Sequence, residues 1–145
     1  IILWFVAVYN GLITARNRVK ESWSDIDVQL KRRHDLIPNL LESVKGYMTH
    51  ERELLTKITA SRSEAMGAQT SGATAKLAQA EGTLGNLLGN LRVAMEAYPD
   101  LKANTNIAQL MDELSDTENK IMASRRFYNA NTRDFKTKME VFPTN

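Results

Sequence analysis

The chain has 145 residues, enough for one domain but too few for two domains with cores of their own. Its 19 Lys and Arg against 17 Asp and Glu leave a net charge of +2. This small value argues against a nucleic-acid binding protein, because such proteins usually carry a marked excess of basic residues. The absence of cysteine excludes disulfides, thiolate metal sites and a cysteine nucleophile.

The chain opens on an apolar segment. Residues 1–15 carry no charge, and residues 16–20 carry three positive charges and no negative one. A membrane-spanning helix needs about 20 apolar residues, so we interpret residues 1–15 as the C-terminal part of an N-terminal transmembrane helix. A buried helix of a soluble protein is the alternative. In this anchor, Trp4 and Tyr9 are expected to lie at the membrane interface as part of an aromatic belt. Arg16, Arg18 and Lys20 are expected to be the positively charged residues that end the membrane-spanning segment.

After residue 15, apolar residues recur at steps of three and four, which is typical of helices with one buried face. Trp23 belongs to the first of these apolar faces and is expected to be buried. The pattern predicts an all-α protein in which residues 16–145 form an antiparallel up-and-down four-helix bundle. The first helix would extend from the transmembrane segment, and the helices are expected at about 2–34, 37–66, 73–98 and 104–139.

The predicted breaks depend on a few residues. Asp35 can cap a helix that has Pro38 in its first turn, although a kinked helix running through Pro38 is the alternative. The small polar stretch 67–72 is expected to be a loop. Pro99 disfavours helical geometry at the preceding residue and should end the third helix, and Asn104 can cap the fourth.

Two surfaces are candidates for association. The third helix carries a row of small residues that could serve as a self-association face, unless it packs inside the bundle or marks a mobile region: Ala78, Gly82, Gly85 and Gly89. Residues 120–138 carry six positive charges and one acid, Asp134, and are expected to face anionic lipid. A basic end that only favours the helix dipole is the alternative. The basic band is Arg125, Arg126, Arg133, Lys136 and Lys138. Phe135 and Phe142 could add apolar contact with the lipid, and packing in the core of the bundle is the alternative for both.

No catalytic or cofactor site is predicted. His50-Glu51 begins like a zinc-peptidase motif, but position 54 is Leu where the second His is required. The basic cluster Lys31-Arg32-Arg33-His34 lacks interleaved aromatics, which favours a solvated turn over a nucleic-acid site. Four charged residues at or beside apolar positions are expected to form ion pairs between helices, with exposure at the rim as the alternative: Asp27, Glu51, Arg62 and Arg125.

The ordered set of motifs resembles the LemA family of bacterial membrane-anchored proteins. The resemblance is carried by Trp23 with Ile26 to Arg33, Asp35 to Leu40, Val44 to Tyr47, His50-Glu51, Tyr98-Pro99, Leu101 to Asn104, Glu118-Asn119 and Tyr128-Asn129. His34 stands where the family more often carries an aromatic residue, and residues 66–83 have no distinctive match. The resemblance implies a membrane helix followed by a four-helix bundle, and it implies no reaction.

Two functions follow as hypotheses. The first is a membrane-anchored scaffold at the bacterial inner membrane, single-pass, with a cytoplasmic bundle. It would self-assemble and could bind other membrane proteins, with no cofactor, nucleic acid or small-molecule substrate. The second is a metal-dependent enzyme or regulator using Glu and His between helices. Di-iron bundles use Glu-x-x-His motifs, and that spacing does not occur in this chain.

Overall fold

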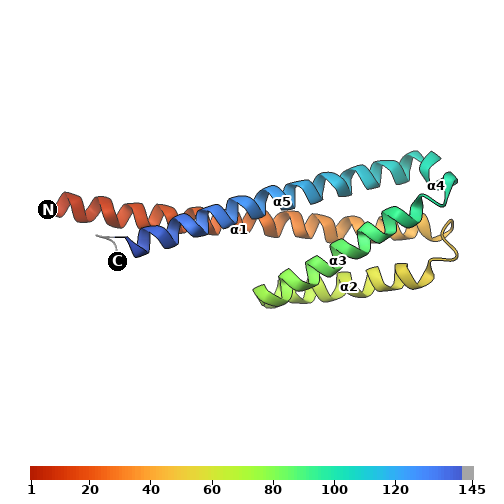
Figure 1. The fold of residues 1–145 in the computed structure, drawn as a ribbon, viewed down its shortest axis with the longest axis horizontal. Helices are drawn as coiled ribbons and strands as arrows, with labels where there is room; N and C mark the ends of the chain where they lie inside the picture. Colours follow the sequence, from red (N-terminus) through yellow and green to blue (C-terminus); the bar gives the residue numbers. More distant parts are fainter. Residues whose placement is uncertain (142–145) are drawn as a thin grey trace. The chain divides into compact units, whose positions relative to one another are not determined.

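The computed structural model describes residues 1–141 and confirms the all-α prediction (Figure 1). The helices are α1 (Ile2–Lys45), α2 (Arg52–Ser71), α3 (Thr74–Met95), α4 (Pro99–Ala103) and α5 (Thr105–Glu140), and no strand occurs within residues 1–141. Phe142, named above for its expected apolar contact, lies outside the described residues.

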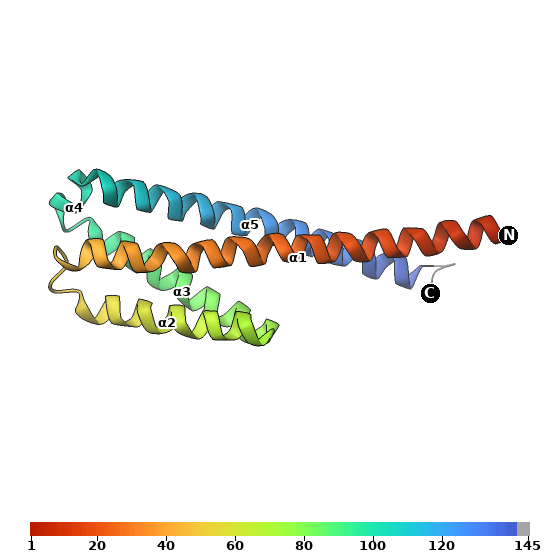
Figure 2. The same cartoon turned by 180° about the vertical axis from the view of Figure 1, so that it is seen from behind.

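The chain divides into two compact units. Unit 1 comprises Ile1–Leu30 and Glu118–Asn145, and unit 2 comprises Lys31–Thr117. Unit 2 contains the C-terminal part of α1, the whole of α2, α3 and α4, and the start of α5 (Figure 2). Its apolar core draws side chains from all five helices, including Ile37, Ile58, Leu88, Leu101 and Ile107, which are at most 1% exposed.

Helices α2 and α3 lie side by side and are joined by a tight turn (Figures 1 and 2). The turn needs glycine because Gly72 has φ +72°, in the left-handed region that ends helices. Its N–H donates to the carbonyl of Gln69 at 3.4 Å. The predicted loop at 67–72 is therefore shorter than expected, since α2 continues to Ser71.

The break around Pro99 occurs where the sequence predicts it. Helix α3 ends at Met95, and Pro99 begins the short helix α4, which the apolar periodicity does not predict. Proline is tolerated there because the first turn of a helix has no intrahelical use for its N–H. The predicted cap at Asn104 is confirmed, because its Oδ1 accepts a hydrogen bond of 3.2 Å from the N–H of Ile107.

The predicted helix boundary between residues 34 and 37 is wrong. Helix α1 runs through Pro38 without interruption, so Asp35 is an exposed residue inside a helix and not a cap. The chain reverses later, at residues 46–51, where the N–H groups of Tyr47 and Met48 both donate to the carbonyl of Val44. Proline inside a helix normally kinks or breaks it, because one helical hydrogen bond is lost.

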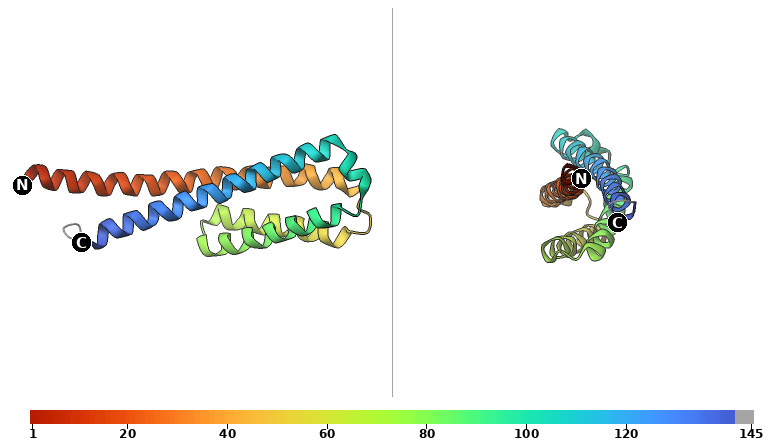
Figure 3. Two further views of the ribbon diagram at one scale, coloured as in Figure 1. Left: turned by 45° about the horizontal axis from the view of Figure 1, so that its top comes forward. Right: turned by 90° about the vertical axis from the view of Figure 1, so that its left-hand side faces the viewer.

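Unit 1 is a pair of helices, the first part of α1 and the last part of α5. The rings of Trp23 and Tyr128 lie with centroids 5.3 Å apart, and Trp23 is half-buried where the sequence predicts burial. One turn further along, Asn131 Nδ2 donates to Ser22 Oγ at 2.6 Å and to the Arg18 carbonyl at 3.5 Å. The two helices are antiparallel, and the first turns of α1 extend beyond the end of α5 (Figure 3).

Candidate functional site

The first turns of α1 expose an unusually apolar surface. We call this surface the apolar end, and its exposed members are Ile1, Ile2, Leu3, Trp4, Phe5, Val6 and Tyr9. Ile2, Leu3 and Phe5 have 80%, 84% and 61% of their surface exposed. Contiguous exposed apolar surface of this kind marks interaction sites. Within residues 1–141, none of the helices combines the length and apolar character needed to cross a membrane.

Basic side chains from both helices of unit 1 follow the apolar end. Asn131 lies beside Arg18 and Ser22, and from there the last turns of α5 continue toward the apolar end of α1. We call this group the basic collar, and its members are Arg16, Arg18, Lys20, Arg133, Lys136 and Lys138. Its members are exposed except Lys138, which is half-buried with Nζ 3.7 Å from Asp134. Arg125 and Arg126 are also exposed but lie further along α5 from the apolar end.

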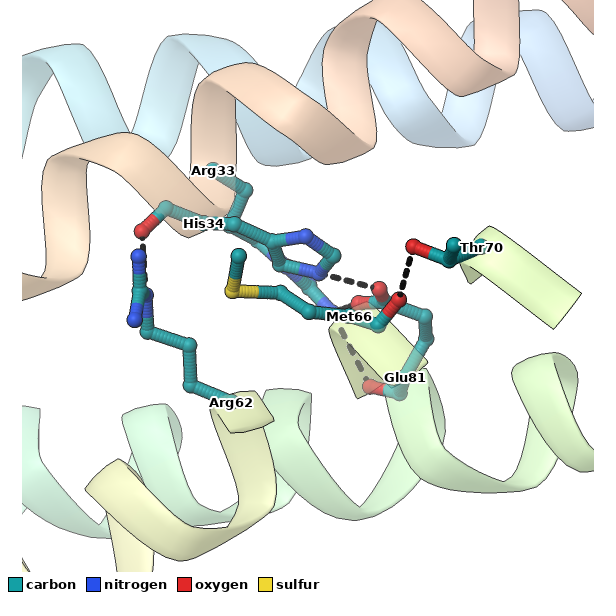
Figure 4. A network of polar contacts seen from close by, with 6 residues as sticks. All are labelled: Arg33, His34, Arg62, Met66, Thr70 and Glu81. Carbon is teal, nitrogen blue, oxygen red and sulfur yellow. Dashed lines mark hydrogen bonds and ion pairs between the residues drawn. The ribbon is translucent and has the colours of Figure 1, made fainter. Parts of the chain in front are cut away.

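A buried polar network joins α1 to α3 in unit 2 (Figure 4). Both carboxylate oxygens of Glu81 are engaged: Oε1 lies 2.5 Å from His34 Nε2, and Oε2 accepts from Arg33 Nη2. The same Arg33 nitrogen also donates to the Glu81 carbonyl at 3.0 Å. The side chains of Arg33, His34 and Glu81 are 7%, 2% and 10% exposed. A carboxylate only accepts hydrogen bonds, so His34 Nε2 carries a proton in this arrangement.

The network contradicts the prediction of a solvated turn at residues 31–34. The segment is helical, so its four side chains point in different directions, and Arg33 and His34 face the core. Lys31 is exposed, and Arg32 Nη1 pairs with Asp116 Oδ2 of α5 at 3.0 Å. Burial by itself raises the pKa of Glu81, but the hydrogen bond from His34 and the positive charge of Arg33 outweigh burial and hold that pKa below its ordinary value.

The side chain of Arg62 in α2 joins this network by binding the backbone of His34. Its Nε donates a hydrogen bond of 2.6 Å to the carbonyl oxygen of His34. Proline has no N–H, so Pro38 cannot donate to this carbonyl four residues earlier as an ordinary helical residue would. Arg62 supplies that donor, which accounts for the continuity of α1. His34 thereby has its side chain bound to α3 and its backbone bound to α2.

Three of the four residues predicted to form interhelical ion pairs lie elsewhere, and the pairing of Asp27 stays a prediction. Arg62 binds a carbonyl, Arg125 is exposed on α5, and Glu51 precedes α2 without a capping hydrogen bond from its side chain. Asp27 is half-buried in α1. A buried ion pair between helices does form between Arg33 and Glu81, and the sequence signal for it was the position of Glu81 directly after Ala80, a residue of the buried face of α3.

The small-residue row of α3 does not make close helix contacts within the chain. Ala78, Gly82 and Gly89 are exposed, and a methyl group added at Gly82 or Gly89 would meet nothing within 4 Å. At Gly85, which is half-buried, that methyl group would lie 3.8 Å from Arg33 Nη1. His50, the first residue of the failed zinc motif, is exposed. Across residues 1–141, no three His, Asp or Glu side chains gather closely enough to hold a metal ion.

The sequence of the chain is similar to a known protein family and to several of its relatives. A model described as LemA family matches residues 22–145. Protein LemA of Metamycoplasma hominis is 32% identical over 146 residues, covering 99% of this chain and 66% of that protein. Magnetosome protein MamQ of Magnetospirillum gryphiswaldense is 23% identical over 158 residues, covering 93% and 58%. MamQ 2 of Paramagnetospirillum magneticum is 22% identical over 160 residues, covering 94% and 59%. The chain therefore spans less than two thirds of the length of these relatives.

Proposed function

Because the chain belongs to the LemA family, we propose that it works as a membrane-associated helical scaffold without a catalytic reaction. The observation that carries the proposal is the apolar end of α1 followed directly by the basic collar. Insertion of the apolar end into a bilayer would remove its side chains from water. Each collar residue near anionic head groups would add about 1 kcal/mol, weakened by salt.

The proposed placement is single-pass at the bacterial inner membrane. In this arrangement residues 1–15 belong to the membrane anchor, with Trp4 and Tyr9 near the interface. Positive residues that follow an apolar segment are retained on the cytoplasmic side, so Arg16, Arg18 and Lys20 favour a cytoplasmic bundle. The helices of unit 2 would form the antiparallel up-and-down bundle, and its outer faces would bind other membrane proteins or further copies of the chain.

Vesicle sedimentation tests the membrane contact. We expect the chain to sediment with anionic vesicles at low salt and less with neutral vesicles. Replacing Arg133, Lys136 and Lys138 by Gln should weaken binding to anionic vesicles and leave the helical circular dichroism unchanged. Replacing Leu3 and Phe5 by Gln should weaken binding to both kinds of vesicle, because it removes apolar contact and no charge.

A charge-matched control comes from unit 2. Lys57, Lys76 and Lys102 are exposed there, and their replacement by Gln removes the same charge away from the collar. If the two triple variants lost the same amount of binding to anionic vesicles, binding would depend on overall charge, and this would contradict the proposed role of the basic collar. Sedimentation of the unchanged chain with neither kind of vesicle would remove the membrane contact itself.

Self-assembly is the second part of the proposal. The row Ala78, Gly82, Gly85 and Gly89 is supported as its contact surface because it is largely exposed and makes no close contact inside the chain at Gly82 or Gly89. Small residues let two helix backbones approach closely, which favours packing between copies. No observation favours the alternative of a metal-dependent enzyme.

A further inference from the structure

An elongated groove lies between α1 and α2 in unit 2, and we call it the α1–α2 groove. Its volume is about 550 Å³, within the range of small-molecule sites. Apolar side chains from both helices and the turn between them line it: Ile37, Pro38, Leu41, Met48 and Leu55. Arg52 and Arg62 stand ten residues apart on α2, so the groove extends for roughly 15 Å along that helix.

The charges on the groove are unbalanced. Three cations, Lys45, Arg52 and Arg62, line it together with one acid, Glu42. Glu42 is already 3.9 Å from Lys45 within α1, so the arginines are left without a neutralising carboxylate among the lining residues. An apolar floor with surplus positive charge is complementary to a ligand that has an apolar chain and a negative group.

The two arginines offer different environments for such a group. Arg52 is exposed, so its charge is screened by solvent and salt. Arg62 is half-buried and fixed in place, because its Nε is bound to the His34 carbonyl. A guanidinium has five N–H donors, so the terminal nitrogens of Arg62 remain available to a carboxylate or phosphate while Nε stays bound.

We propose that the α1–α2 groove binds an anionic amphiphile, with its carboxylate or phosphate on the terminal nitrogens of Arg62 and its apolar chain along Leu41 and Leu55 toward Met48. The site lies in unit 2 and is separate from the apolar end and the basic collar of unit 1. Membrane binding by the collar and ligand binding by the groove can therefore succeed or fail independently.

Titration with short amphiphiles of equal chain length tests the proposal on the whole chain. The probes are decanoate and decyl phosphate as anions, decanol as the neutral control and decyltrimethylammonium as the cation, all below their aggregation concentrations. The chain is labelled with ¹³C at its methionine methyl groups. Met48 lines the groove, whereas the exposed Met139 lies in unit 1 and reports adsorption elsewhere. We expect saturable shifts of the Met48 signal with both anions and unchanged Met139.

Variants identify the contact with the head group. Arg62→Met should weaken decanoate binding at least tenfold. Since Arg62 also supports α1, a second variant, Thr59→Glu, places a carboxylate one turn from Arg62 at an exposed position and should weaken binding similarly. Lys57→Met is the control, because Lys57 is exposed, pairs with Glu53 at 3.2 Å and does not line the groove.

Three results would overturn the proposal. The first is a Met48 signal that does not respond to either anion. The second is equal binding of the cationic and anionic probes, which would show that the protein recognises the alkyl chain of the probe and not its head group. The third is equal loss of affinity in Arg62→Met and Lys57→Met, which would show that net charge and not the groove binds the anion.

Discussion

Arg62 Nε of α2 lies 2.6 Å from the carbonyl oxygen of His34 in α1, the oxygen that Pro38 leaves without its helical donor. An interior proline ordinarily costs about 3 kcal/mol or more, in part because that carbonyl loses its partner. A hydrogen bond from a charged donor recovers about 1.5–3 kcal/mol. The break in the helix that Pro38 predicts is avoided through a residue 24 positions later in the chain.

A double-mutant cycle tests this relationship. Arg62→Met should lower the free energy of unfolding by about 1–3 kcal/mol, because it leaves a buried carbonyl without a donor. In a Pro38→Ala background the cost should be smaller, since the alanine N–H can donate to the His34 carbonyl and restores the helical hydrogen bond. Urea denaturation followed by circular dichroism measures both. Arg52→Met is the control, and strict additivity of Arg62→Met with Pro38→Ala would contradict the compensation.

Glu81 should make the stability of unit 2 sensitive to acid. Its pKa in the folded chain lies below the ordinary 4.5, so its contribution is complete above that value and is lost as pH falls through the lower folded-state pKa. Glu81→Gln should cost about 3–5 kcal/mol at neutral pH, because it leaves the buried Arg33 without its counter-charge. The variant should also lose less further stability than the unchanged chain between neutral pH and pH values below 4.5.

The matched control for Glu81 is Glu53→Gln. Glu53 pairs with Lys57 at 3.2 Å, but its side chain is 84% exposed. We expect little change in stability and an acid dependence like that of the unchanged chain. Parallel acid profiles for Glu81→Gln and the unchanged chain in urea titrations would argue against a role of the carboxylate in acid sensitivity.

Leu88→Ala should destabilise the chain more than Trp23→Ala, despite the larger size of tryptophan. Leu88 is fully buried in unit 2, and truncation of such a residue costs about 2–5 kcal/mol. Trp23 is half-buried against Tyr128, an aromatic contact worth about 0.5–1.5 kcal/mol beyond its buried area. Thermal unfolding of both variants decides the order, and a larger loss for Trp23→Ala would mean that its ring is more deeply enclosed.

Gly82→Leu and Gly89→Leu should reduce self-association without unfolding the bundle. A side chain at either position meets nothing close within the chain, so any loss would come from contact between copies. Gly85→Leu is a poorer test because it approaches Arg33. Light scattering of the whole chain in detergent measures assembly, and Asn90→Leu, exposed on α3 beside the row, is the control. A monomer at every concentration would contradict self-assembly.

Apolar periodicity predicted the helices well where local rules decide their ends. Asn104 caps its helix and Pro99 follows the end of α3, and both depend only on neighbouring residues. Pro38 misled the prediction because its compensation comes from Arg62, which is distant in sequence. Helix α4 was missed because one buried residue, Leu101, is too few to show a period.

The buried network of Arg33, His34 and Glu81 was also not predicted, because it too depends on residues distant in sequence. Arg33 and His34 belong to a run of four basic residues, and such runs are usually solvated. Their burial depends on Glu81, which lies nearly fifty positions away on α3, and nothing in the sequence of either helix pairs the two segments. Periodicity identifies which face of a helix is buried, but it does not show which helix supplies the counter-charge.

The Arg33–His34–Glu81 network also discriminates between alignments of α3 along α1. A slip of one helical turn, about 5.4 Å, would bring Leu77 or Gly85 to the place of Glu81. Neither residue can accept a hydrogen bond through its side chain, so a buried guanidinium would have no counter-charge. Misaligned packings that bury equally apolar surfaces would carry this penalty, whereas a core of leucine alone would tolerate them. Three polar residues thereby specify one register among several that hydrophobicity alone would accept.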